Sequence, residues 1–437
     1  MKRLTLFFLA LSLIGLLGAC SPHDGDDLDA KGLALSAEKF EWGTAVRSQT
    51  LTVNTYASWT IESNVGWCEP RKKSGLGKTE LSLWVSPNIT HEARSGQLTV
   101  RSAGQTKTVS ISQPAFPEGV QHSYVVPVVY HVFYKNQNDT TQNISASWLP
   151  RITDGVNKLY RDNEAHVQFE LAEYDDDGNR LDEPGVIRHR VTFDDYDPMD
   201  FLDPDNDDNS RFASYMLNLQ RNINIFIFRF SDEQTMGLSD LAVAPSNHEL
   251  DSLLTLDWMN DKTHVDFPYG CCINSQYIYE TQEDGYYNTL YSVATVAHEL
   301  GHYLGLLHSF SEHECLDDDA CSDTPRCDYN AYVEEVSRRL QKIMDAGKQP
   351  TLRELAQRVS CDDGSTYTAD NIMDYAYCYS DKLSQQQKER IRHVLNYCPT
   401  LPGPKLDSPA STRAAQAHWQ RPRIVVCPAA PSFATTK

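Results

Sequence analysis

The feature that most constrains this chain is a frame of three histidines, one glutamate and one glycine. Its residues are His298, Glu299, His302, Gly305 and His308, in the pattern H-E-x-x-H-x-x-G-x-x-H. Residues four apart share one face of a helix, so His298 and His302 can direct two imidazoles at one ion. Gly305 can adopt a positive φ and end the helix sharply, which brings His308 round as a third ligand. Three imidazoles with one open position predict a catalytic zinc site, because four protein ligands close a structural one.

Glu299 follows the first histidine of the frame directly. There it can reach a water molecule at the metal without binding the metal itself, which predicts a general base. Two histidines four apart are common on ordinary helix faces and would mean little alone. Five fixed residue types in so short a frame rarely coincide by chance, so the pattern favours metal-dependent hydrolysis.

The N-terminus has the composition of an export signal. Met1-Lys2-Arg3 is basic, an apolar run follows, and Cys20 ends it, which predicts a signal peptide at residues 1–19 and not a spanning helix. The segment Leu17-Gly-Ala-Cys20 resembles a bacterial lipobox, in which Cys20 becomes the lipid-modified first residue. An ordinary secretory peptide with an incidental cysteine is the alternative, and both interpretations predict export.

Residues 20–29 are acidic and polar, which predicts a flexible tether. An acidic patch after a lipid site resembles the surface-export signals of some Gram-negative lipoproteins, although a plain linker is the alternative. We therefore expect a lipid anchor in the outer membrane and a protein that faces the cell exterior. The balance of 39 basic to 60 acidic residues argues against nucleic acid as a partner.

Residues 30–115 have the pattern of an all-β domain. Short alternating runs recur at even spacing and are separated by turn sequences such as Ser74-Gly-Leu-Gly77, which predicts a small β-sandwich. Several segments resemble the BACON family of β-sandwich modules: Trp59-Thr-Ile, Gly66-Trp-Cys, Asn88-Ile-Thr, Arg94-Ser-Gly-Gln-Leu-Thr-Val and Val109-Ser-Ile-Ser-Gln113. The resemblance implies carbohydrate or mucin binding, or a spacer role, and leaves both open.

Four tryptophans of this domain could stack on sugars: Trp42, Trp59, Trp67 and Trp84. Tryptophan in a small sandwich is more often part of the core, so the sequence favours the core role without excluding the other.

A second domain is predicted at residues 124–398. Residues 124–134 form a near-continuous apolar run typical of a buried strand, and residues 145–162 have helical periodicity. Residues 167–171 and 223–228 predict further strands. Residues 237–244 are a candidate edge strand along a substrate cleft, where an extended peptide could add itself as another strand.

Further motifs follow the frame. They are Ser309-Phe310, Asp323-Thr-Pro325 and Asn371-Ile-Met-Asp-Tyr375. Together with the frame they resemble the pappalysin-type metzincin proteases, which implies an α/β zinc endopeptidase domain and a multidomain fold with the sandwich first. Residues 245–270 and 329–360 depart from the family pattern, and residues 331–359 predict a two-helix insertion. Residues 399–437 resemble no family and are predicted to be disordered.

The resemblance implies roles for two residues of the last motif. Met373 would pack beneath the metal and do no chemistry. Tyr375 would approach the metal and stabilise the charge that develops on the scissile carbonyl, although a packed aromatic at a turn is the alternative. The resemblance also implies a possible calcium ion near the acidic residues Asp317, Asp318, Asp319 and Asp323, with a solvated loop as the alternative.

Eleven cysteines fit an exported protein with disulfide bonds. Five of them bracket the loop between the frame and the methionine turn: Cys315, Cys321, Cys327, Cys361 and Cys378. By resemblance we pair Cys361 with Cys378.

Two functions remain possible. The first is a zinc endopeptidase that acts on extracellular proteins or peptides. The alternative is an inactive, protease-like surface lipoprotein that binds carbohydrate or mucin. Loss of activity usually begins with the glutamate or a ligand, and the sequence retains Glu299 and all three histidines, which favours the enzyme.

Overall fold

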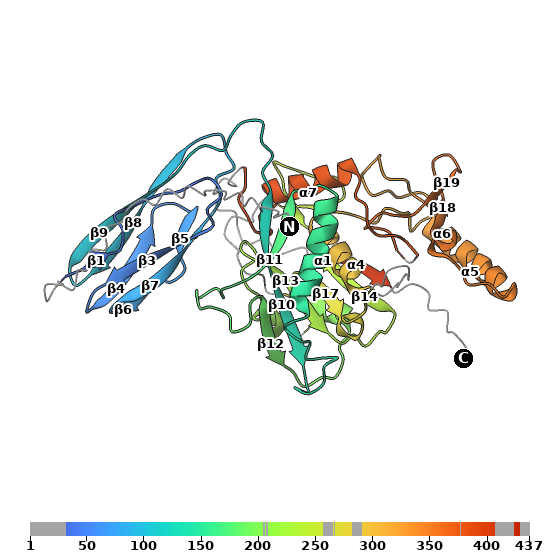
Figure 1. The fold of residues 1–437 in the computed structure, drawn as a ribbon, viewed down its shortest axis with the longest axis horizontal. Coiled ribbons are helices and arrows are strands. Elements are labelled where there is room, and N and C mark those ends of the chain that lie inside the picture. Colours follow the sequence, from blue (N-terminus) through green and yellow to red (C-terminus); the bar gives the residue numbers. More distant parts are fainter. Residues whose placement is uncertain are drawn as a thin grey trace, which may run out of the picture.

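The computed structural model describes residues 32–203, 206, 209–256, 265, 267–281, 291–375, 377–406 and 424–428. A β-sandwich lies at one end and a mixed α/β domain at the other (Figure 1), which confirms the predicted fold class. The predicted signal peptide, Cys20 and the acidic tether lie outside the described residues. Within the described part of the chain, no helix is long and apolar enough to cross a membrane.

The sandwich consists of two sheets packed face to face. The first has the order β1 (Ala34–Leu35), β3 (Ser48–Asn54), β7 (Thr79–Val85) and β5 (Cys68–Pro70). The second has the order β2 (Lys39–Glu41), β9 (Gln105–Gln113), β8 (Arg94–Ser102), β4 (Ser58–Ser63) and β6 (Ser74–Leu76). Alternate residues of the central strands face inward, as Leu51 and Val53 do, and form one apolar core.

The larger domain is built on a twisted sheet. Its order is β11 (Val167–Leu171), β10 (Tyr124–Tyr134), β13 (Ile223–Phe228), β17 (Cys271–Asn274), β14 (Thr235–Asp240) and β20 (Ile424–Pro428), and β12 (Val186–Arg190) also pairs with β10. Strands β10 to β13 and β17 run parallel, whereas β14 is antiparallel to β17. Both faces of the central strand β13 are buried, which explains its continuous apolar sequence.

Two long helices pack together on this sheet: α1 (Leu149–Asp162) and α4 (Ser292–Tyr303). They approach closely at Gly155, where a Cβ atom would lie 2.7 Å from a methyl group of Val293. The hydroxyl of Tyr160 in α1 donates a hydrogen bond of 2.9 Å to the carbonyl of Ala297 in α4. Helix α1 therefore fixes the position of α4, which carries the histidine frame.

The chain after α4 has less regular structure. It contains α5 (Tyr329–Asp345), α6 (Leu352–Leu355), the hairpin of β18 (Gln357–Val359) and β19 (Thr366–Thr368), and α7 (Gln385–Tyr397). Helices α5 and α6 form the predicted two-helix insertion, and a capping box of Thr351 and Glu354 begins α6. Shorter elements elsewhere are α2 (Pro198–Leu202), α3 (Asn209–Ala213), β15 (Val243–Pro245), β16 (Leu254–Leu256) and the 3-10 helix η1 (Ser275–Tyr277).

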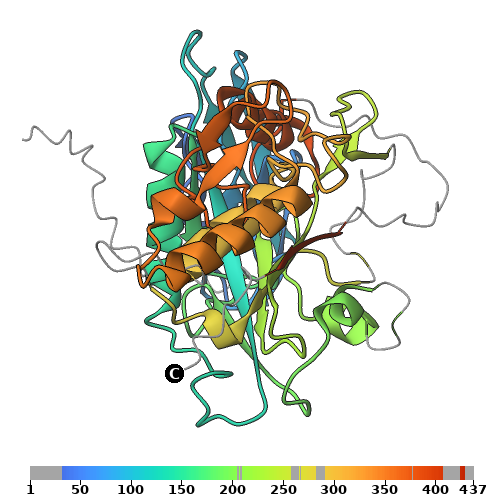
Figure 2. The same ribbon diagram turned by 90° about the vertical axis from the view of Figure 1, so that its right-hand side faces the viewer.

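The prediction of a disordered tail at 399–437 is wrong for two segments. Residues 401–406 are ordered with Leu401 buried, and β20 pairs antiparallel with β14 (dark red in Figure 2). The prediction that residues 237–244 form the edge of the sheet is wrong for the same reason, because β20 lies outside β14. An edge strand presents unpaired backbone groups, and the apolar run Ile424-Val-Val satisfies them.

Candidate active site

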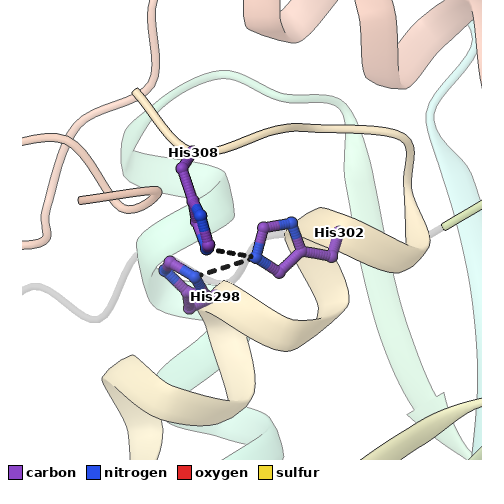
Figure 3. A group of neighbouring side chains, drawn as sticks. All are labelled: His298, His302 and His308. Atoms are coloured by element: carbon purple, nitrogen blue, oxygen red, sulfur yellow. Dashed lines mark hydrogen bonds between the residues drawn. The ribbon is translucent and has the colours of Figure 1, made fainter. Parts of the chain in front are cut away.

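The three histidines of the frame come together at one end of α4 (Figure 3). His298 and His302 project from consecutive turns of the helix, and His308 reaches them from the chain that follows. The Nε2 atom of His302 lies 3.0 Å from Nε2 of His298 and 3.1 Å from Nε2 of His308. All three rings are buried, and they are the only such metal-binding group among the described residues.

The second nitrogen of each ring faces a hydrogen-bond partner. Nδ1 of His298 lies 2.7 Å from the carbonyl of Ile372, and Nδ1 of His302 lies 2.8 Å from the carbonyl of Leu306. Nδ1 of His308 lies 3.0 Å from a carboxylate oxygen of Glu312. These acceptors place the protons on Nδ1 and leave the Nε2 lone pairs facing one another.

This donor set fits a zinc ion. Three lone pairs at such short separations repel one another unless a cation lies between them. Tetrahedral zinc with Zn–N bonds of about 2.0–2.1 Å requires nitrogens about 3.3 Å apart, close to the observed separations. Burial lowers the pKa of His298 to about 4, so its ring is neutral near pH 7, as a ligand must be.

The glycine of the frame ends the helix. Gly305 has a φ of +87°, and its N–H donates to the carbonyl of His302 while the N–H of Leu306 donates to the carbonyl of Gly301. These two bonds form a Schellman motif. A Cβ atom at position 305 would also lie 2.6 Å from a methyl group of Val394 in α7. Both conformation and space therefore require glycine at the turn that redirects the chain to His308.

Glu299 is fully buried beside the first histidine. Strand β14 passes directly against its side chain, since a Cβ atom at Gly237 would lie 2.4 Å from a carboxylate oxygen of Glu299. A side chain at position 237 would thus displace the carboxylate. Gly237 lies at the start of the candidate edge strand, and its sequence context carries no signal of this contact.

Met373 and Tyr375 belong to a turn beneath the histidines. Met373 is buried, and its sulfur occupies the space that a side chain at Gly301 would need. The ring of Tyr375 lies 4.3 Å from that of His308 and 5.5 Å from that of His298, measured between centroids. The turn also supplies the carbonyl of Ile372 to His298. It therefore holds one ligand in place and brings the tyrosine next to the group.

Arg358 is a buried residue at this turn that the sequence analysis missed. Its guanidinium lies 3.3 Å from the carboxylate of Asp374, donates to the carbonyl of Tyr375 at 3.0 Å and stacks over the ring of Tyr332 at 3.4 Å. Although burial opposes it, the charge of Asp374 raises the pKa of Arg358. The predicted insertion thus anchors the turn. An arginine in the short sequence Gln-Arg-Val carries no signal of this role.

The predicted pairing of Cys361 with Cys378 is wrong. Cys361 forms a disulfide with Cys315, and the N–H of Cys361 donates to the carbonyl of Arg326. That bond holds the β18–β19 hairpin against the loop after the frame, where Cys315 lies. Cys378 is buried near the turn instead, and its thiol donates to the carbonyl of Asn371. Cys68 is buried in the sandwich core.

The acidic run does not converge on one point. Asp317 accepts hydrogen bonds from the hydroxyl of Ser311 and the N–H of Glu312, Asp319 accepts from the hydroxyl of Thr324, and Asp323 accepts from the N–H of Gln386 at the start of α7. Each of these three carboxylates thus already accepts hydrogen bonds from protein donors. The calcium expectation receives no support from these contacts.

His131 and the four tryptophans of the sandwich lie apart from the site. His131 is buried in the sheet between His189 and the amide of Asn224. Trp42 and Trp59 belong to the sandwich core, and Trp67 packs against it. Trp84 is half-buried, with the guanidinium of Arg221 5.9 Å from its ring. The core role is therefore confirmed for Trp42 and Trp59.

Comparisons with known proteins agree with this geometry. Residues 260–396 match the peptidase M43 family, described as pregnancy-associated plasma protein-A, and residues 57–114 match the BACON family, described as a putative N-terminal binding domain. The search of curated proteins found no match.

Two examples represent the solved structures that are similar to the chain. A promirolysin mutant from Tannerella forsythia is 19% identical over 64% of this chain and 84% of its own, with a TM-score of 0.43. A protein from Bacteroides thetaiotaomicron, determined by NMR, is 17% identical over 23% of this chain and 100% of its own, with a TM-score of 0.17. Because both TM-scores are below 0.5, the family matches alone carry the assignment. The chain therefore combines a BACON domain with a pappalysin-type metalloendopeptidase domain.

Proposed function

We propose that this protein is a zinc endopeptidase that hydrolyses peptide bonds in extracellular proteins or peptides, with Glu299 as the general base. The observation that carries the proposal is the convergence of three Nε2 atoms whose Nδ1 partners are already in place. Such a group needs no rearrangement to hold a metal, which is the pre-organisation that catalysis requires.

Each group has one task in this mechanism. Zinc, when bound by His298, His302 and His308, supplies a Lewis acid that polarises the scissile carbonyl and lowers the pKa of a water molecule. Glu299 accepts a proton from the attacking water and delivers it to the leaving amine. Its burial and the close approach of Gly237 limit the positions that its carboxylate can adopt. The hydroxyl of Tyr375 donates to the oxygen on which negative charge develops.

A cavity of about 310 Å³ adjoins the metal group. His308 and Phe310 line it together with three acidic residues: Glu312, Asp317 and Asp318. Acidic walls favour a positively charged side chain, so we propose that substrates carry lysine or arginine near the cleaved bond. The same preference is implied by the resemblance to pappalysin-type enzymes.

We also propose an exported protein, anchored by lipid at Cys20 and facing the cell exterior. The composition of residues 1–29 supports this location. Binding of carbohydrate or mucin by the sandwich, and of calcium by the acidic run, stay predictions. The positions of the tryptophans and the local partners of the carboxylates favour neither.

Digestion of casein or gelatin tests the proposed reaction. The wild type should degrade either protein, a chelator should stop it, and added zinc should restore it. Glu299→Ala should reduce kcat by a factor of about 10² to 10⁴ while the zinc content stays unchanged. The control is Glu334→Ala, the same change on an exposed residue of α5, which should act like the wild type. Equal digestion by wild type and Glu299→Ala would reject the mechanism and favour the inactive, carbohydrate-binding alternative.

A further inference from the structure

Strand β20 occupies the side of β14 where an extended peptide could bind. It pairs antiparallel with β14, and the partners are Ile424 with Asp240, Val425 with Ser239, Val426 with Leu238 and Cys427 with Gly237. Without β20, β14 would be the last strand of the sheet and would present unpaired N–H and C=O groups. An extended peptide binds such an edge through its main chain, whatever its sequence.

The same strand lies beside the catalytic glutamate. Gly237 is the residue of β14 that packs against the carboxylate of Glu299, and its partner in β20 is Cys427. Ser239 lies two residues further on and therefore on the same face of β14 as Gly237. Val425 pairs with Ser239, so its side chain is directed to the face of the sheet that carries Glu299.

The position of Val425 is independent evidence that β20 reaches the active site. Its side chain is only 6% exposed and lines the cavity that His308, Phe310 and Glu312 also line. A residue more than a hundred positions beyond the frame thus enters the cavity next to a metal ligand. The tail does not simply extend the sheet at a distance from the site. It crosses the site in the way that a bound peptide would.

We propose that residues 424–428 are a built-in occupant of the substrate groove, and this inference rests on the proposed endopeptidase function. The segment runs antiparallel to β14, places an aliphatic side chain in the cavity beside His308 and excludes other peptides. Displacement or removal of the segment opens the groove. A true substrate binds in the same direction and register, with the residue opposite Ser239 directed into the cavity.

Two truncated forms of the full chain test the proposal. One ends at Pro428 and keeps β20, and the other ends at Arg423 and lacks it. Rates are measured as kcat/KM on a fluorogenic peptide, with zinc content and circular dichroism recorded for each form. The form that ends at Pro428 should match the full chain. The form that ends at Arg423 should be at least about tenfold faster, because a tethered segment competes at an effective concentration on the order of millimolar. Where the full chain hydrolyses the peptide, an unchanged or lower rate in the folded, zinc-loaded form that ends at Arg423 would overturn the proposal.

A binding measurement tests the proposal without relying on hydrolysis. A labelled peptide of residues 420–430 is titrated into the form that ends at Arg423, with Glu299→Gln to prevent its cleavage, and fluorescence anisotropy is recorded. We expect saturable binding that an unlabelled substrate peptide displaces, and at least tenfold weaker binding of the same peptide with Val425→Asp. Absence of binding, or binding that the substrate does not displace, would overturn the proposal.

The two proposals fail in different ways. If the full chain is active and the truncation does not raise its activity, the endopeptidase function stands and the proposed occupant of the groove is rejected. Binding of the peptide without any hydrolysis by zinc-loaded forms would reject the function and leave the groove and its occupant.

Discussion

The two halves of the catalytic domain are stabilised in different ways. The half up to α4 is a sheet with two helices, and one large apolar cluster runs through it. In the half from Ser309 to Leu383, the described residues Ile372, Met373 and Leu383 join that large cluster, and the other apolar clusters are small and surround Phe310 and Tyr332. This half is held by a disulfide, a buried ion pair and side-chain hydrogen bonds to the main chain. The metal group needs both halves, because His298 and His302 come from the first and the partner of His298, Ile372, comes from the second.

Because of this difference, the two halves position different parts of the site. The apolar half fixes α4 by packing that tolerates little movement. The second half positions single backbone groups, such as the carbonyls of Ile372 and Tyr375, by specific polar contacts. A network of polar contacts requires every partner, so the loss of one contact should shift the backbone groups at the site. Three changes in the second half and one where the sandwich meets the catalytic domain test this difference.

The largest effect is expected for Arg358→Ala. The change leaves the carboxylate of Asp374 buried without its counter-charge and should lower the free energy of unfolding by about 3–5 kcal/mol. That loss would equal the roughly 2–5 kcal/mol expected for Ile225→Ala in the apolar half. Urea denaturation measures both. The control is Arg353→Ala on an exposed position, where we expect less than about 0.5 kcal/mol. A loss at Arg358 no larger than at Arg353 would contradict the described role of the ion pair.

Removal of the disulfide should come next. Replacement of Cys315 and Cys361 by serine frees a loop of 46 residues and should lower stability by about 2–4 kcal/mol. Hydrogen exchange should rise around β18 and β19 while α1 stays protected. Peptide mapping of the oxidised protein should yield a fragment that links these two cysteines. A fragment that links Cys361 to Cys378 would contradict the structure.

Asp319 makes the stability of the second half depend on pH. Burial raises the pKa of its carboxyl from 3.8 to about 6, although the hydroxyl of Thr324 opposes the shift. The folded state then binds the proton more tightly than the unfolded state, so stability falls as the pH rises from about 4 to 6. Asp319→Asn should remove a decline on the order of 1–3 kcal/mol, seen as the difference between the two stability curves across that range. Parallel curves would show that Asp319 does not titrate in this window.

The smallest effect is expected where the sandwich meets the catalytic domain. Arg47 forms an ion pair with Glu170 at 2.5 Å, and both side chains are more than a third exposed. Solvent screens such a pair, so Arg47→Ala should cost about 1 kcal/mol or less. A double-mutant cycle with Glu170→Ala measures the coupling, which should shrink further at high salt. Coupling as large as the loss at Arg358 would show that burial does not explain the difference between the two contacts.

The sequence predicted much of the fold because its signals are local. The helical insertion depends on residues three or four apart, and the apolar run of β10 depends on its own neighbours. The C-terminal tail shows where prediction from local signals fails. Its strand exists only because β14 supplies an edge, and β14 lies far away in the sequence.

The same distinction between local and tertiary signals applies to the three histidines and the residues around them. The spacing of His298 and His302 follows from the helical repeat, and the turn to His308 follows from a glycine that can adopt a positive φ. Both are properties of a short stretch of chain, and the sequence alone determined them. Tertiary structure decided the partner of Cys361, the role of Arg358 and the occupant of β14. Each of these depends on which distant groups become neighbours once the apolar core has formed, and no local spacing encodes that choice.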